Sequence, residues 1–299
     1  MKLTKLLAVA AALIVAASCE KPIISDSDAT DEHGNPVEQV DADVKKFTFT
    51  LKGDFSSAWK PVTRGYLQAD GKDLTDVWVL DYMDGKLVQQ VHQTDNTADD
   101  FGKPVMSLKY GSHHIYFIAS RGQGAQLDTD AKTITFSKVL DTFYKDYEVS
   151  VSGSSNGNRA VTLDRVVTRL RLTITDAVSV ETSTISITPD TRYYGLDYLT
   201  GDPCEPKTEA TILTIPDTDK GKTGIQINIF GFSQADEWKT DVTITALNAD
   251  NQTISSVKLM DVPFKANRIT EYAGPLFGSE GAMSLGLNST WDDAYTGTW

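Results

Sequence analysis

Ala160-Val-Thr-Leu-Asp-Arg-Val-Val-Thr-Arg-Leu-Arg-Leu-Thr-Ile-Thr175 is the stretch that most clearly indicates the fold. In its second half, Leu170, Leu172 and Ile174 alternate with polar residues. Because successive side chains of a strand point to opposite faces, this alternation predicts a strand with one buried face. We expect it to be the first long strand of a β-domain.

Strand patterns continue on both sides of this stretch. Phe47, Phe49 and Leu51 alternate with polar residues, and Asp84-Gly85 between two apolar runs is a strong hairpin signal. No long amphipathic pattern typical of a helix stands out. The other strand-like runs are residues 113–119, 132–136, 147–151, 183–188, 210–215, 225–232, 241–247 and 254–259.

Short strands at this spacing are typical of β-sandwiches. The Gly-, Ser- and Asn-rich residues 152–158 form the best candidate for a boundary between two domains. The sequence therefore predicts an all-β chain. It has an N-terminal β-sandwich at residues 47–158 and a C-terminal β-sandwich with a tail strand at residues 159–299.

The first residues have the features of an export signal. A basic start, a short apolar run and small residues predict a signal peptide at residues 1–18. The apolar run is shorter than a spanning helix requires. Ala16-Ala17-Ser18-Cys19 resembles a bacterial lipobox, in which Cys19 carries the lipid and becomes the first mature residue. The alternative is an ordinary signal peptide that is cut near Ser18.

Residues 19–46 are rich in Asp and Glu and have no apolar periodicity, which predicts a disordered, extended tether. It is either a plain linker or a surface-export signal. The net charge of −13 argues against a nucleic-acid partner, which would need clustered Lys and Arg.

The chain offers few signals for catalysis or metal binding. It has no G-x-S-x-G motif, and its 41 acidic residues make any single pair of carboxylates uninformative. His113 and His114 would point to opposite faces of a strand and would not share an ion. Cys204 has no basic neighbours that would activate it. We therefore expect no enzymatic activity, no metal and no cofactor.

Several motifs, taken in order, resemble those of the Bacteroidales fimbrillins, the subunits of type V pili, and their anchor proteins. Besides the lipobox, they are Val62-Thr63-Arg64, residues 74–82, residues 161–170, residues 264–270 and residues 274–277. The resemblance implies two transthyretin-like, Greek-key sandwich domains. It also implies a lipid-anchored precursor at the outer membrane that assembles with other fimbrial subunits on the cell surface.

The resemblance also implies strand exchange. An arginine-specific protease would cut between Arg64 and Gly65 and remove the first strand, with its side chains Phe47, Phe49 and Leu51. The vacated groove would accept a strand from the tail of another subunit. In this chain that strand would come from residues 282–299, where the alternating apolar residues are Met283, Leu285 and Leu287.

Two alternatives remain open at this point. The anchor members of the family keep their lipid and their first strand, so this chain could be a membrane-retained anchor. It could also be an outer-membrane lipoprotein that binds polysaccharide. Tryptophans that could stack on sugars, although such residues are more often part of a core, are Trp59, Trp238, Trp291 and Trp299.

Overall fold

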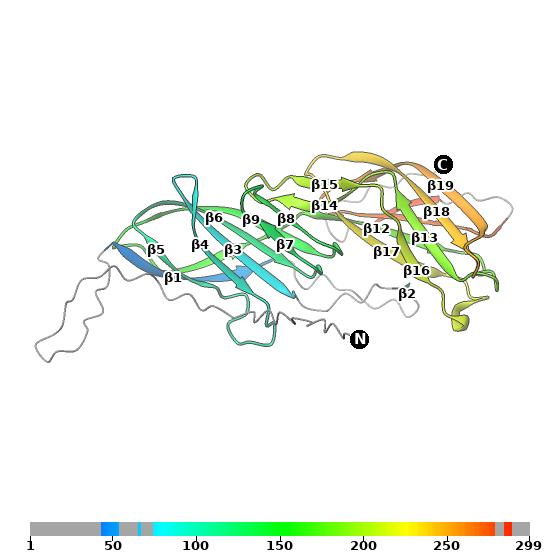
Figure 1. Cartoon of the computed structure of the whole chain (residues 1–299), viewed down its shortest axis with the longest axis horizontal. Helices are drawn as coiled ribbons and strands as arrows, with labels where there is room; N and C mark the ends of the chain where they lie inside the picture. Colours follow the sequence, from blue (N-terminus) through cyan, green and yellow to red (C-terminus); the bar gives the residue numbers. More distant parts are fainter. Residues whose placement is uncertain (1–42, 54–64, 67–73, 279–283, 289–299) are drawn as a thin grey trace, which may run out of the picture. The chain divides into compact units, whose positions relative to one another are not determined.

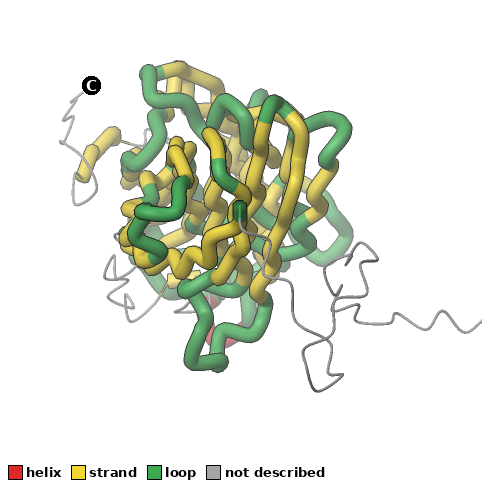
Figure 2. Tube along the Cα trace, turned by 90° about the vertical axis from the view of Figure 1, so that its left-hand side faces the viewer, coloured by secondary structure: helices red, strands yellow, loops and turns green. Residues whose placement is uncertain are grey.

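The computed structural model describes residues 43–53, 65–66, 74–278 and 284–288. Within these residues the chain consists of β-strands and loops, and the one helical element is the short 3-10 helix η1 (Asp217–Asp219) (Figure 1, Figure 2). In the described part of the chain, no helix is long and apolar enough to cross a membrane. The prediction of an all-β fold is confirmed.

Two sheets enclose an N-terminal core. The smaller sheet has the strand order β10 (Asn158–Thr162), β1 (Val44–Lys52) and β5 (Val105–Lys109). The larger sheet has the order β11 (Asp164–Arg165), β9 (Thr142–Val151), β6 (Gly111–Ser120), β3 (Asp76–Met83) and β4 (Lys86–Gln93). Side chains of both sheets form one apolar cluster, which includes Phe47, Phe49, Leu108, Phe117 and Val161.

The β3–β4 hairpin forms where the sequence predicts it. Asp84 and Gly85 both have positive φ, 51° and 72°, as a two-residue type I′ turn requires. The flanking strands pair antiparallel from Val77 opposite Gln93 to Met83 opposite Lys86.

Two further sheets enclose a C-terminal core. One has the order β16 (Thr211–Thr214), β13 (Thr184–Pro189), β18 (Trp238–Leu247) and β19 (Thr253–Phe264). The main path of the other is β21 (Ser284–Asn288), β20 (Ile269–Gly274), β12 (Val167–Ile174), β17 (Ile225–Phe232), β14 (Arg192–Asp197), β8 (Thr133–Thr135) and β7 (Gln126–Asp128). β15 (Pro203–Lys207) pairs with β14, and β2 (Gly65–Tyr66) pairs with β17. As predicted, Leu170, Leu172 and Ile174 of β12 are buried in the core between these sheets.

A third apolar cluster contains side chains from both halves of the sequence. β8 pairs antiparallel with β14, with Ile134 opposite Leu196. Around this junction Tyr82, Tyr198 and Phe232 are buried in one cluster, and the Tyr82 and Tyr198 hydroxyls are 2.8 Å apart. Strands and apolar side chains from both halves of the sequence therefore meet at this junction.

Two expected boundaries differ from those in the structure. β1 begins at Val44, so the last residues of the expected tether, up to Lys46, already belong to the first strand. The expected boundary after Asn158 does not end the N-terminal core, because β10 pairs with β1 and both Val161 and Leu163 are buried in that core. The Gly- and Ser-rich residues 152–157 are the connection between β9 and β10.

Candidate strand-exchange site

β1 lies in the middle of its sheet. It pairs parallel with β10, from Thr48 opposite Asn158 to Lys52 opposite Thr162. On its other edge it pairs antiparallel with β5, from Val44 opposite Lys109 to Thr48 opposite Val105. Because β10 and β5 both pair with β1, loss of β1 would leave unpaired backbone groups on both neighbours.

The inward face of β1 supplies large apolar side chains to the N-terminal core. Phe47 and Phe49 are fully buried, and Leu51 packs against the same cluster. The Phe49 ring lies edge-on to Phe117, with ring centroids 5.1 Å apart, and edge-on to Tyr147 at 6.2 Å. Full burial of each such side chain stabilises a fold by about 1.5–3 kcal/mol, so β1 is a major part of this core.

Backbone contacts also hold β1 closely. The N–H of Thr48 donates to the carbonyl of Gly157 at 2.7 Å, and the N–H of Phe49 donates to the carbonyl of Pro104 at 3.0 Å. A Cβ at position 157 would lie 2.3 Å from the carbonyl oxygen of Lys46, so only glycine fits there. The spacing of apolar residues had not singled out Gly157, because this requirement comes from a strand far away in the sequence.

Three of the residues that were predicted to act in processing and exchange lie outside the described residues, namely Cys19, Arg64 and Met283. Gly65 is described. With Tyr66 it forms β2, which pairs parallel with β17 through Gln226 and Ile227. The residue after the expected cut is therefore attached to the C-terminal sandwich, whereas Phe47 and Phe49 belong to the N-terminal core.

The tail segment that was predicted to donate a strand is partly described. Leu285 and Leu287 lie in β21, which pairs antiparallel with β20 and ends the order of the larger C-terminal sheet. Asp176 fixes the chain just before this tail. Its carboxylate oxygens accept hydrogen bonds from the backbone N–H groups of residues 276–278 at 2.6–2.9 Å.

Two of the motif segments meet in space at a buried charge cluster, which we define as Arg121, Asp141 and Arg165. Asp141 accepts two hydrogen bonds from Arg165, at 2.6 and 3.2 Å, and one from Arg121 at 3.4 Å. Arg165, from the motif at residues 161–170, also donates to the side chain of Asn267, from the motif at residues 264–270, at 2.9 Å. These motifs therefore connect the two sandwiches, and no local sequence pattern identifies Asp141 as their partner.

The two adjacent histidines do not form a metal site. His113 is buried and lies between the carboxylate of Asp81, at 2.7 Å, and the carbonyl oxygen of Lys109, at 2.8 Å. His114 lies on the opposite face of β6, where its own side chain is exposed. Burial raises the pKa of Asp81, and the hydrogen bond with His113 opposes this shift. Among the described residues, no group of His, Cys, Asp and Glu side chains could hold a metal ion.

Trp238 is partly buried and packs against the C-terminal core. Its ring meets those of Tyr193 and Phe264 edge to face, with centroids 5.4 and 5.3 Å apart. Its indole N–H donates to the hydroxyl of Ser233 at 2.8 Å. The other three candidate sugar-binding tryptophans, Trp59, Trp291 and Trp299, lie outside the described residues.

The thiol of Cys204 should react slowly in the folded protein. Burial, together with the negative charges of Glu205 and Asp197, raises its pKa to about 11. Since the thiolate is the reactive form, alkylation by iodoacetamide at pH 8 should be roughly 100-fold slower in the native state than in denaturant. Mass spectrometry of a Cys19→Ala variant over time measures both rates. Equal rates would contradict the expected protection.

The fold is shared with Bacteroides proteins of solved structure. A candidate polysaccharide-binding protein from Bacteroides thetaiotaomicron is 9% identical with a TM-score of 0.52, over 84% of this chain and 98% of that chain. A candidate adhesin from the same organism is 9% identical with a TM-score of 0.51, over 82% and 97%. A candidate adhesin from Bacteroides ovatus is 11% identical with a TM-score of 0.50, over 73% and 82%. At such identities the likeness concerns the fold alone.

No curated protein matches the sequence of this chain. A family model, by contrast, matches residues 126–298. The match begins at β7 and includes all the described strands of the C-terminal sandwich except β2. The chain therefore belongs to DUF6562, a family of unknown function.

Proposed function

We propose that this chain is a structural subunit of a cell-surface fimbrium that assembles by strand exchange. The observation that carries the proposal is the position of β1. It is the first described strand, it lies between β5 and β10, and it buries Phe47 and Phe49 completely. A strand at the start of the chain that fills the centre of a sheet is a suitable element for one cut to release.

The groove that β1 would leave has the properties of a strand acceptor. It would have an apolar floor that includes Leu108, Phe117 and Val161. On both sides it would have unpaired backbone groups, and extended peptides add to such edges by main-chain hydrogen bonds. In the proposal, the donor is the tail of another subunit, with Met283, Leu285 and Leu287 as the alternating apolar residues.

The positions of Gly65 and Asp176 support the two other steps of the proposal, which are the release of β1 after the cut and the donation of the tail strand. After a cut between Arg64 and Gly65, β2 would keep the new N-terminus on the C-terminal sandwich while the segment with β1 leaves. The three hydrogen bonds that Asp176 accepts would hold the base of the tail while β21 leaves β20 for a neighbouring subunit. In this scheme Cys19 carries the lipid of the outer-membrane precursor, and the subunit has no enzymatic role.

The names of the solved relatives agree with a surface role. Two of them are described as candidate adhesins and one as a candidate polysaccharide-binding protein.

The alternative within the family is an anchor that keeps its lipid and β1. It differs from the proposed subunit in one measurable way, because an anchor in a fibre would begin at Cys19 and a polymerising subunit would begin at Gly65.

The test is processing by an arginine-specific protease. Treatment of the mature chain should give a new N-terminus at Gly65 and a ladder of stable oligomers. Arg64→Lys is the matched control, because it keeps the charge and removes the recognised residue, and it should stay monomeric. A chain without residues 282–299 should be cut but should not form the ladder. Uncut Arg64, or fibre subunits that begin at Cys19, would contradict the proposal.

A further inference from the structure

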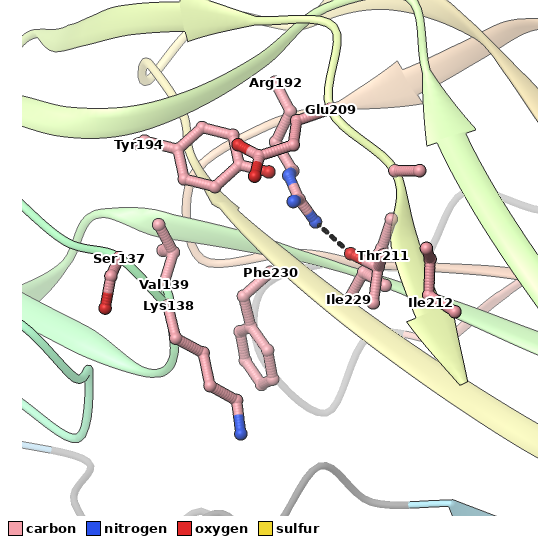
Figure 3. Close-up of a pocket in the computed structure, with 11 residues that line it drawn as sticks. Ser137, Lys138, Val139, Arg192, Tyr194, Glu209, Thr211, Ile212, Ile229 and Phe230 are labelled. Atoms are coloured by element: carbon pink, nitrogen blue, oxygen red, sulfur yellow. Dashed lines mark hydrogen bonds between the residues drawn. The ribbon is translucent and has the colours of Figure 1, made fainter. Parts of the chain in front are cut away.

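A pocket opens in the C-terminal sandwich where two strands separate. β14 pairs with β17 only at Tyr193 opposite Phe232, and beyond this pair the strands diverge. The resulting cavity has a volume of about 260 Å³ and lies between β14, β16, β17 and the loop at residues 137–139. We call it the Arg192 pocket; the lining residues that matter here are Lys138, Arg192, Tyr194, Glu209, Thr211 and Phe230 (Figure 3).

Arg192 is the central polar group of the pocket. Its guanidinium lies 4.5 Å from the centre of the Tyr194 ring and donates to the hydroxyl of Thr211 at 2.8 Å (Figure 3). Burial lowers the pKa of Arg192 to about 10, so the side chain remains charged at neutral pH. Its Nε has no hydrogen-bond partner within the described part of the chain, which leaves a donor for a ligand.

Tyr194 supplies a second unused polar group. The residue is only 4% exposed, and its hydroxyl has no hydrogen-bond partner among the residues that the structure describes. A buried hydroxyl without a partner costs stability, typically about 1–3 kcal/mol. An occupant of the pocket that hydrogen-bonds to this hydroxyl would remove that cost.

The charges of the pocket differ from those of the whole chain. Arg192 and Lys138 outweigh Glu209 here, although the net charge of the protein is −13. The planar guanidinium matches a carboxylate in shape and charge. Glu209, in turn, can only accept hydrogen bonds when ionised, so it suits hydroxyl groups on the ligand. Phe230 and Tyr194 provide apolar surface for C–H groups.

We propose that the Arg192 pocket binds one hexuronic acid unit of an acidic glycan. Arg192 pairs with the carboxylate, while Glu209 and the Tyr194 hydroxyl bind ring hydroxyls. The cavity is smaller than the roughly 300–1,000 Å³ of pockets for drug-sized ligands, so it holds one sugar unit rather than an oligomer. An acidic peptide side chain would leave Glu209 without hydroxyl partners. This binding does not depend on strand exchange and would hold for a polymerising subunit or an anchor.

The experiment is calorimetric titration of the mature chain with glucuronic acid, with glucose as the neutral probe and N-acetylglutamate as the peptide-like acid. Glucuronic acid should bind at least tenfold more tightly than either. Arg192→Gln should abolish this preference over glucose. Arg192→Lys should weaken it, because an ammonium group cannot donate the two parallel hydrogen bonds that a guanidinium donates to a carboxylate. Lys86→Gln, which removes an exposed positive charge from β4, should leave binding unchanged.

Tyr194→Phe separates a binding role from a structural one. It removes only the unpartnered hydroxyl, so the free protein should be as stable as wild type or more stable. Affinity for glucuronic acid should nevertheless fall several-fold. No binding of glucuronic acid to the wild type, or binding that Arg192→Gln and Tyr194→Phe leave unchanged, would overturn the proposal. Equal or tighter binding of N-acetylglutamate would overturn it in favour of an acidic peptide ligand.

Discussion

Deletion of residues 19–64 should lower the free energy of unfolding of the N-terminal sandwich by about 5–10 kcal/mol. The deletion removes β1, and with it the fully buried rings of Phe47 and Phe49 and the partly buried Leu51. It also removes the ladders to β5 and β10, where each hydrogen bond contributes a net of about 1 kcal/mol. The expected loss is comparable with the whole stability of a typical domain.

Denaturant titration followed by tryptophan fluorescence measures this loss. The control is a chain that begins at Asp43, which lacks the tether and keeps the whole of β1, and its stability should equal that of the mature protein. If the deletion instead costs less than about 2 kcal/mol, β1 contributes little to the core and cannot drive exchange.

The same deletion gives a direct assay of the groove. A synthetic peptide of residues 43–53 should bind the deleted chain and restore its stability, because it carries all of β1. A peptide with Phe47→Ser and Phe49→Ser should fail, since it would place two hydroxyls in the apolar core. Rescue by both peptides would show that backbone pairing alone suffices, and the fit of the aromatic side chains would then not select the donor.

The strands that could be predicted from the sequence are those with a local pattern. Side chains alternate along a strand, so Leu170, Leu172 and Ile174 indicate one buried face without any knowledge of the partner strands. The turn at Asp84-Gly85 depends on two adjacent residues that accept positive φ. In both cases the information lies within a few residues, and the predictions were correct.

Strand pairing between distant segments could not be predicted in this way. Residues 158–162 follow a Gly- and Ser-rich segment and resemble the start of a new domain, yet they pair with β1. The short strands β7 and β8 belong to the N-terminal half of the sequence, yet they extend the C-terminal sheet. Hydrophobic patterning indicates that a strand has a buried face, but it does not identify its neighbour.

The burial of charged residues could not be predicted for a related reason. Alternation assigns Arg169 of β12 to the face opposite Leu170, and such a face is usually solvated in a sandwich. In the structure Arg169 is buried, and loss of solvation lowers its pKa to about 9. Buried charges require a partner. The negative charge of Asp141, the carboxylate of the charge cluster, acts on Arg169, but Asp141 lies just before β9 and no local pattern connects it to β12.

Asp141→Asn should therefore be among the most destabilising single substitutions in this chain. Asp141 is 1% exposed, and the two arginines of the charge cluster, Arg165 and Arg121, are 6% and 3% exposed. Asparagine has nearly the same shape, so the substitution leaves no cavity. It removes the negative charge and replaces one acceptor oxygen by an NH2 group, which cannot accept a hydrogen bond from an arginine. Loss of one partner from a buried ion pair costs about 3–5 kcal/mol, because the remaining charge stays buried without compensation.

Asp164→Asn is the matched control, because it removes a carboxylate from the residue next to Arg165. The side chain of Asp164 is 71% exposed and pairs with Lys145 at 3.1 Å, so its loss should change stability by no more than about 0.5 kcal/mol. Equal effects of the two substitutions in denaturant titration would mean that Asp141 does not stabilise the buried charges of Arg121 and Arg165. A large effect of Asp141→Asn alone would establish that the segment between the two sandwiches depends on one buried carboxylate.

Because Arg165 also binds Asn267 of the C-terminal sandwich, Asn267→Ala combined with Asp141→Asn should then cost less than the sum of the separate losses.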